Sequence, residues 1–240
     1  MCVVTFYVFF TTTVSESVAG GSSDTIKNAP YLVSLNTGKF RQRHFCGGVI
    51  IALSWILTAG HCMRNVGLDD FIVRAGSSYR NQGGQIRSVS RVVVHEYNNL
   101  FIRNDFDFAL LELESPLAPE DTTYPVPLTD RNDHHAPEDI CFVAGWGRSE
   151  SSRGSVKPYP YAKCQKFFIT AQITEAKICA GGSEINACNG DSGGPLVCNL
   201  KLTGIVSWGR GNTCGSPYSP YVVYGNVARA RNWISVHSGV

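Results

Sequence analysis

Short apolar runs recur along the chain, separated by stretches rich in glycine, proline and small polar residues. The runs are Tyr31–Leu35, Gly48–Leu57, Phe71–Arg74, Val92–His95, Phe108–Leu113, Ile140–Ala144, Pro195–Val197, Gly204–Trp208 and Tyr221–Tyr224. Short runs bounded by turn residues are typical of strands in a sandwich or a barrel, and not of strands that alternate with helices. The pattern therefore predicts an all-β protein.

The end of the chain has the pattern of a helix. Asn226 is suited to cap it, and one face of the helix carries Val227, Ala230, Trp233, Ile234 and His237. The composition of Ser152–Tyr161 predicts a loop, and the polar, proline-containing stretch Pro116–Glu138 predicts a linker between two halves.

The first ten residues, MCVVTFYVFF, are almost continuously apolar, and small polar residues follow them. This run is too short to cross a bilayer, but it fits the core of a secretory signal peptide. Ser15 and Ser17 have the small side chains expected before a cleavage site, so we expect residues 1–17 to be removed. The alternative is a buried N-terminal strand.

The cysteine count supports secretion. Without residues 1–17, and hence without Cys2, eight of the nine cysteines remain. An even number after a signal peptide indicates disulfides. A zinc site is the competing interpretation, but the chain has no CxxC or paired Cys/His spacing. The count leaves the pairing open, because eight cysteines allow 105 combinations.

Composition excludes several classes of protein. Of the 240 residues, 43% are hydrophobic and 17% are charged, which suffices for a core and argues against intrinsic disorder. The net charge is +2 and there is no basic run, so we expect no nucleic-acid partner. No later apolar run approaches the length of a membrane span, so we expect no membrane association.

Three segments carry candidate chemistry. In Cys188–Cys198, Gly-Asp-Ser-Gly-Gly forms a tight turn that exposes the hydroxyl of Ser192. A serine becomes a nucleophile when a base and donors for an oxyanion lie within reach. LTAGHC ends an apolar run with His61, and DFDFALLEL places Asp107 at the start of another. Together, in the order His, Asp, Ser, they predict nucleophilic catalysis.

On these motifs the chain resembles the secreted trypsin/chymotrypsin-like serine proteases, from Val18 to the C-terminus. The resemblance implies that His61 is the general base, Asp107 orients it and Ser192 is the nucleophile. Asp105 is the less favoured candidate for the acid, because the apolar register follows Asp107. The family usually has alanine where this chain has Gly60.

The resemblance also implies a fold of two antiparallel six-stranded β-barrels with a C-terminal α-helix. It divides the single protease domain 18–240 into an N-terminal barrel of about 18–125, a C-terminal barrel of about 126–225 and a helix of about 226–238. We expect a monomer without cofactor or metal. Its expected partners are protein or peptide substrates, with protein inhibitors or host proteins besides. The implied disulfides are Cys46–Cys62, Cys141–Cys198, Cys164–Cys179 and Cys188–Cys214.

Further roles follow from the same resemblance. The backbone N–H groups of Gly190 and Ser192 form the oxyanion hole, and the ammonium of a mature N-terminus at Val18 pairs with Asp191. The segment Ser207, Trp208 and Gly209 binds the substrate backbone as an added strand. The loop Ser77–Gly84 supplies no carboxylate, so we expect no calcium site there.

The specificity pocket departs from the family pattern. Its floor position holds Asn186, which lacks the charge that favours lysine or arginine substrates. Its far wall usually has a glycine, whereas the stretch Pro217–Val227 places Tyr221 or Val222 there. Tyr218 is the alternative for a different gap. A bulky wall predicts a narrowed pocket, and ordinary packing of the tyrosines is the alternative.

Two functions follow from these observations. The first is a secreted serine endopeptidase of non-tryptic, restricted specificity. The second is a protease-like protein with an occluded pocket that acts by binding protein partners. The occluded pocket resembles that of the group 3 mite allergens and their inactivated paralogues, although this chain keeps all three triad residues.

Overall fold

The computed structural model describes residues 18–38, 42–98, 102–133, 136–147, 151–182, 185–210, 214 and 220–240. The predicted signal peptide and Tyr218 lie outside the described residues.

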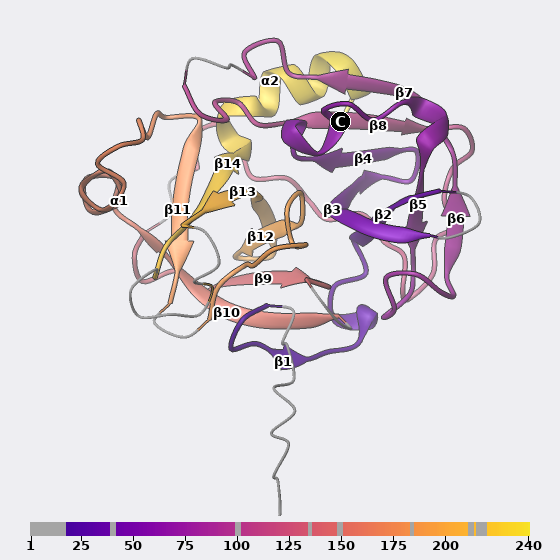
Figure 1. Cartoon of the computed structure of the whole chain (residues 1–240), viewed down its shortest axis with the longest axis horizontal. Helices are drawn as coiled ribbons and strands as arrows, with labels where there is room; N and C mark the ends of the chain where they lie inside the picture. The colour runs from indigo at the N-terminus through magenta and orange to yellow at the C-terminus, as the bar shows by residue number, and fades with distance from the viewer. Residues whose placement is uncertain are drawn as a thin grey trace, which may run out of the picture.

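Seven antiparallel strands form a curled N-terminal sheet, drawn in purple tones in Figure 1. The order across the sheet is β6-β5-β2-β3-β4-β8-β7. The strands are β2 (Leu32–Thr37), β3 (Arg43–Ala52), β4 (Trp55–Thr58), β5 (Phe71–Ala75), β6 (Gln85–Arg87), β7 (Val89–Val94) and β8 (Ala109–Leu113).

The C-terminal sheet closes into a barrel. Its order is β1-β10-β11-β14-β13-β12-β9, and an additional pairing of β10 with β9 completes a ring of six strands. The strands are β1 (Ser22–Ser23), β9 (Cys141–Gly145), β10 (Ser152–Tyr159), β11 (Lys177–Gly181), β12 (Pro195–Cys198), β13 (Lys201–Gly209) and β14 (Val222–Asn226). The predicted all-β, chymotrypsin-like fold class is therefore confirmed, as one closed barrel and one curled sheet.

Two α-helices follow the pattern only in part. The C-terminal helix α2 (Val227–Ser238) begins after Asn226 as predicted, but the Asn226 side chain accepts no capping bond from the helix, and its amide donates to the Glu175 carbonyl. Helix α1 (Tyr161–Phe167) was not predicted, because its sequence has no periodic pattern of apolar residues. The 3-10 turns are η1 (Ile26–Asn28), η2 (Gly60–Met63) and η3 (Leu68–Asp70). Among the described residues, no helix has the length and apolar character needed to cross a bilayer.

The prediction of a loop over Ser152–Tyr161 is wrong, because residues 152–159 form β10. Its residues alternate between buried and more exposed positions, and the buried ones are Ser152, Gly154, Val156 and Pro158. Ser152, Gly154 and Pro158 are small or cyclic residues. The two-residue period of burial along the strand is therefore not visible in the sequence as an alternation of apolar and polar residues. Close approach inside the barrel requires them: a Cβ at Gly154 would lie 2.2 Å from the Ile185 side chain.

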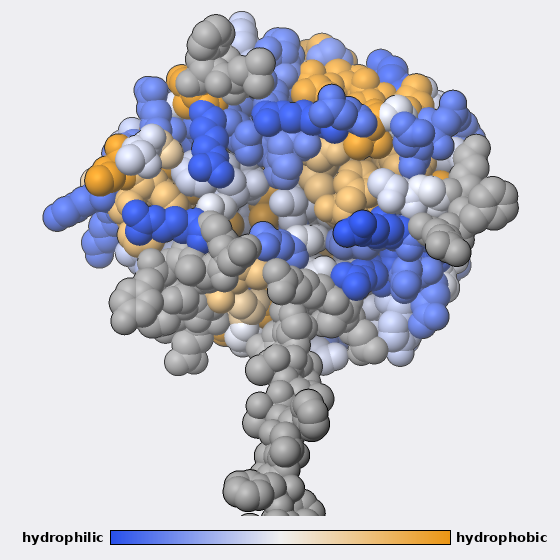
Figure 2. Space-filling model, viewed as in Figure 1, coloured by the Kyte–Doolittle hydropathy of each residue, from blue (hydrophilic) through white to orange (hydrophobic). Residues whose placement is uncertain are grey.

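The two sheets share the helix α2, whose Trp233 and Ile234 are buried in the core of the N-terminal sheet. Of the stretch predicted as a linker, residues 116–133 and 136–138 are described, and Leu128 bridges to Leu202 of β13. Figure 2 shows polar and apolar side chains interspersed on one face, with apolar ones gathered mainly over strands of the N-terminal sheet. Residues of both sheets, such as Leu110 of β8 and Ile205 of β13, therefore share one core cluster with helix α2.

Candidate active site

His61 lies in η2, directly after the buried strand β4. The disulfide Cys46–Cys62 ties this turn to β3. The imidazole Nδ1 lies 2.7 Å from Asp107 Oδ2, and the His61 backbone N–H donates to Asp107 Oδ1 at 2.8 Å. Since Nδ1–H donates to the carboxylate, the lone pair is on Nε2, where a general base needs it.

Asp107 is buried just before β8, and each of its carboxylate oxygens accepts two hydrogen bonds. Asn98 Nδ2 donates to Oδ1 at 3.2 Å, and the Ser207 hydroxyl of β13 donates to Oδ2, beside the two bonds from His61. Burial alone raises the pKa of Asp107, but the interactions with His61 and Ser207 outweigh it and hold the pKa below its ordinary value. The carboxylate is therefore ionised at neutral pH.

Asp105, the less favoured candidate for the acid, has a different role. Its Oδ1 pairs with Lys177 Nζ of β11 at 3.0 Å and accepts from the Thr174 hydroxyl. Burial lowers the pKa of Lys177, and the bond to Asp105 opposes that effect. This pair ties the loop before β8 to the C-terminal barrel.

Ser192 lies in a tight turn between the Cys188–Cys214 disulfide and β12. Gly190 and Gly193 have φ of +99° and +80°, and a Cβ at Gly190 would lie 2.4 Å from the Gly147 carbonyl oxygen. Only glycine fits such a backbone without strain. Among the backbone–backbone hydrogen bonds of the described residues, none has the Gly190 or the Ser192 N–H as its donor.

His44 holds the carbonyl of Gly190 from behind this turn. Burial lowers the pKa of His44 to about 4, so the ring is neutral near pH 7. Its Nε2–H donates to the Gly190 carbonyl at 2.7 Å, and Nδ1 accepts from the Ser34 hydroxyl at 2.7 Å. His44 thereby fixes the carbonyl of the Gly190–Asp191 peptide, whose N–H donates to the Cys188 carbonyl at 2.9 Å.

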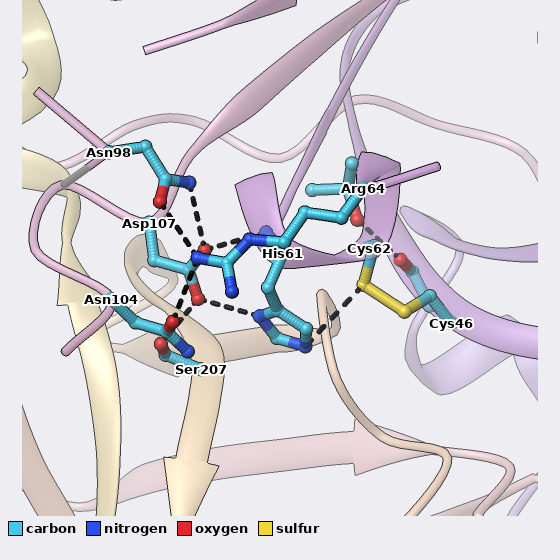
Figure 3. Close-up of polar contacts among 10 residues, drawn as sticks. Cys46, His61, Cys62, Arg64, Asn98, Asn104, Asp107 and Ser207 are labelled. Carbon is cyan, nitrogen blue, oxygen red and sulfur yellow. Dashed lines mark hydrogen bonds and ion pairs between the residues drawn. A yellow bond between two sulfur atoms is a disulfide. The ribbon is translucent and has the colours of Figure 1, made fainter. Parts of the chain in front are cut away.

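Figure 3 shows His61 with Nδ1 toward Asp107 and Nε2 toward the sulfur of Cys62. Nε2 lies 3.8 Å from that sulfur, and no hydrogen bond joins it to Ser192 among the described residues. Nucleophile–base bonds are often long without substrate. The Cys46, Cys62 and His61 ligand atoms lie within 4.8 Å of one another, but the two sulfurs form a disulfide and offer no thiolate to a metal.

The predicted partners Val18 and Asp191 are both fully buried. In this chain the Val18 N–H donates to the Ser152 hydroxyl at 2.7 Å. The Asp191 carboxylate accepts from the backbone N–H groups of Gly147 and Cys188, each at 2.8 Å. Burial raises the pKa of Asp191 to about 7, against the effect of these two bonds.

A cavity of about 270 Å³ opens beside Ser192. Asn186, which is fully buried, lines it, and its Nδ2 donates to the Gly182 carbonyl at 3.1 Å. The strand residues Ser207, Trp208 and Gly209 form one wall. The predicted pocket residues are therefore together, with one exception.

That exception is Tyr221, whose ring packs against Tyr159 and Phe167 at centroid distances of 4.3 and 4.9 Å. It does not line the cavity, whereas Val222 does. Of the two alternatives for the far wall, the structure places Val222 there. The Tyr221 ring instead belongs to an apolar cluster with Trp208 and the Cys164–Cys179 disulfide, which is the ordinary packing considered above.

The four disulfides that the resemblance implied are all present. Three contributors to the site were missed from the sequence: the Ser207 bond to Asp107, the Asn98 amide and the His44 bond to Gly190. The partners in these bonds are separated by 100, 9 and 146 residues. No local pattern in the sequence reports such contacts.

Comparisons with known proteins agree with this geometry. The Trypsin family model matches residues 18–234. Trypsin 5G1 of Aedes aegypti is 38% identical over 239 residues, which cover 94% of this chain and 86% of that protein. The vitellin-degrading protease of Bombyx mori is 36% identical, covering 90% and 84%. Hypodermin-A of Hypoderma lineatum is 35% identical, covering 90% and 86%. The chain belongs to the trypsin family of serine proteases.

Proposed function

We propose that this protein is a secreted serine endopeptidase that cleaves after small or uncharged side chains. The observation that carries the proposal is the oriented His61–Asp107 pair, with Ser192 at the edge of a cavity lined by a neutral Asn186. The relatives named above support hydrolysis of proteins as the reaction class.

The geometry supports the following mechanism. His61 Nε2 takes the proton of Ser192 as the hydroxyl attacks the carbonyl carbon of the scissile bond. The N–H groups of Gly190 and Ser192 stabilise the negative oxygen of the tetrahedral intermediate, where one such donor is worth on the order of 3 kcal/mol. His61 returns the proton to the leaving amine, and water then hydrolyses the acyl-enzyme by the reverse sequence.

The substrate backbone is proposed to lie against Ser207–Gly209 as an added antiparallel strand. Its side chain enters the cavity, where Asn186 offers a hydrogen bond but no charge, and Val222 narrows the wall. An arginine or lysine side chain would lose hydration there without a carboxylate to pair with. These features support non-tryptic, restricted specificity.

Secretion is the second part of the proposal. The chain has four disulfides. Disulfides form and persist chiefly in oxidising compartments. The apolar residues 1–10 and the small residues Ser15 and Ser17 fit a signal peptide cleaved before Val18. Such cleavage would create the ammonium that Asp191 needs as a partner.

The alternative function is that of a protease-like binding protein without turnover. It is favoured by one observation, the position of His61 Nε2 near the Cys62 sulfur with no bond to Ser192. Against it, the described residues leave a cavity of about 270 Å³ beside Ser192, and the Tyr221 ring lies outside their lining of it.

A fluorophosphonate probe and a peptide library separate the two functions. We expect the protein beginning at Val18 to be labelled at Ser192 and to cleave peptides after small side chains. Ser192→Ala should abolish labelling and hydrolysis while the thermal unfolding curve stays unchanged, because the hydroxyl is the attacking group. Hydrolysis that survives in Ser192→Ala would contradict the assignment. Labelling without turnover would favour the binding protein.

A further inference from the structure

Gly60, the residue before His61, leaves space that a neighbouring amide fills. A Cβ built at Gly60 would lie 1.9 Å from Asn98 Nδ2 and 3.0 Å from the carbonyl oxygen of Phe108. Atoms without a bond between them do not approach to 1.9 Å, so any side chain at position 60 displaces the Asn98 amide. The missing methyl group therefore admits this amide to the buried carboxylate of Asp107.

The orientation of the Asn98 amide is fixed from its other end. Its Nδ2 donates to Asp107 Oδ1 at 3.2 Å, while its Oδ1 accepts from the Arg64 guanidinium at 3.3 Å. The same guanidinium nitrogen donates to Asn104 Oδ1 at 3.1 Å. Figure 3 shows the Arg64 side chain reaching past His61 to both asparagines. Because a guanidinium only donates and a carboxylate only accepts, the amide cannot be reversed between them.

The backbone of Asn98 is also tied to the segment that carries Asp107. The Asn98 N–H donates to the His95 carbonyl at 2.8 Å, which closes the turn after β7. The His95 N–H in turn donates to the Phe108 carbonyl at 3.0 Å. The amide and the carboxylate thus belong to two segments that are held in register with each other.

We propose that Asn98 is a positioning residue of the triad, admitted by Gly60 and oriented by Arg64. Asn98 and the His61 backbone N–H together hold Oδ1, so that Oδ2 stays directed at the imidazole. The inference rests on the proposed function, because it concerns the same His61–Asp107 pair. It adds a network, Arg64–Asn98–Asp107–His61, that begins at the exposed surface and ends at the base.

Steady-state kinetics of four variants test this network. Asn98→Asp keeps the size and the acceptor for Arg64 but replaces the donor by a second negative oxygen, and we expect kcat to fall at least about tenfold. Asn98→Leu removes the donor and should lower kcat about threefold to tenfold, the value of one hydrogen bond. KM should change less than twofold in both, since neither variant alters the cavity. Arg64→Gln, at an exposed position, should give a smaller fall in kcat. Asn132→Leu, in an exposed turn, is the matched control.

Gly60→Ala tests the steric part. It should lower kcat as much as Asn98→Leu. The double variant Gly60→Ala/Asn98→Ala should be no worse than the poorer of its two single variants, Gly60→Ala and Asn98→Ala. Losses that multiply in the double variant would show that the two positions act independently and would overturn the proposal.

A spectroscopic measurement separates this inference from the proposed function. The proton on His61 Nδ1, followed by NMR in the full folded protein, should shift in Asn98→Asp and Asn98→Leu and stay in place in Asn132→Leu. If the wild type is not labelled by fluorophosphonate, the proposed function fails, and the resonance still reports whether Asn98 acts on the pair. An unchanged resonance with unchanged kcat in Asn98→Asp would overturn the role of Asn98.

Discussion

The carboxylate of Asp107 gathers donors from three separate parts of the chain: His61 in η2, Asn98 in the turn after β7 and Ser207 in β13. A buried carboxylate stays ionised only when such donors offset the hydration it has lost. The orientation of the base therefore depends on several residues, and most of them never touch a substrate. Asn186 is a contrasting case, because the specificity proposed for the cavity depends on its own neutral amide.

Introducing a negative charge at position 186 should change the preferred substrate. In Asn186→Asp, a carboxylate lines the cavity and can form a charge-assisted bond with a lysine or arginine side chain. We expect kcat/KM for substrates with these residues to rise about tenfold or more, as measured on matched peptides. Asn186→Ala, which also loses the bond to Gly182 but adds no charge, is the control. Strong cleavage after arginine by the wild type would refute the non-tryptic pocket.

At the scale of elements, the site depends on how closely β14 of the C-terminal barrel approaches the start of β8. Gly225 of β14 lies against the ring of Phe108, and a Cβ there would come within 2.7 Å of that ring. Phe108 directly follows Asp107 and is fully buried. The contact between the two halves therefore constrains Phe108 and, through it, the adjacent Asp107.

Filling this contact should damage stability and activity together. Gly225→Ala forces the Phe108 ring to move, and overpacking of this kind costs about 1–3 kcal/mol. We expect a lower midpoint in chemical unfolding and a lower kcat, because Asp107 moves with Phe108. Gly182→Ala is the control for stability, since its Cβ would meet its nearest neighbour at 3.5 Å, an ordinary contact. Equal midpoints for the two variants would show that the halves adjust without strain.

At the scale of the whole molecule, the first described residues cross to the C-terminal barrel. Strand β1 pairs with β10, Ala19 bridges to Asn186, and Val18 is buried among barrel residues. The turn that carries Ser192 lies between this segment and the curled sheet, from which His44 reaches the Gly190 carbonyl. Cleavage before Val18 would place a positive charge in the same interior as the buried Asp191.

This arrangement predicts different pH dependences of stability for the intact chain and for a form that begins at Val18. In the intact chain the folded pKa of Asp191 is about 7, above the ordinary 3.8, so its contribution to the unfolding free energy is lost as the pH rises from about 4 to 7. With the Val18 ammonium as a partner, the folded pKa of Asp191 should fall, so that the carboxylate is ionised throughout this interval and the loss of stability between about pH 4 and 7 disappears.

Urea unfolding of both forms at pH 5 and pH 7 measures this difference. We expect the advantage of the Val18 form to grow between these pH values by about 1–3 kcal/mol. His44, whose pKa burial lowers to about 4, contributes equally to both forms and cancels in the difference. A constant difference between the two forms would contradict the ion pair of Val18 with Asp191.

The sequence by itself determined the all-β class, the C-terminal helix after Asn226 and the three segments that carry His61, Asp107 and Ser192. It did so because these features are local: a run of apolar residues reports a buried strand, and glycines beside Ser192 report a backbone that other residues cannot follow. Only the tertiary structure decided that residues 152–159 form a strand, that Val222 and not Tyr221 lines the cavity, and that Asn98 and His44 support the site. The small residues of β10 are buried by strands elsewhere in the chain. Tyr221 lies just before β14 and packs on Tyr159 and Phe167, while Val222, the first residue of β14, lines the cavity, and pairing with β11 and β13 sets the register of β14. Contacts between distant segments depend on how the two sheets pack, and the sequence pattern around each contacting residue does not predict them.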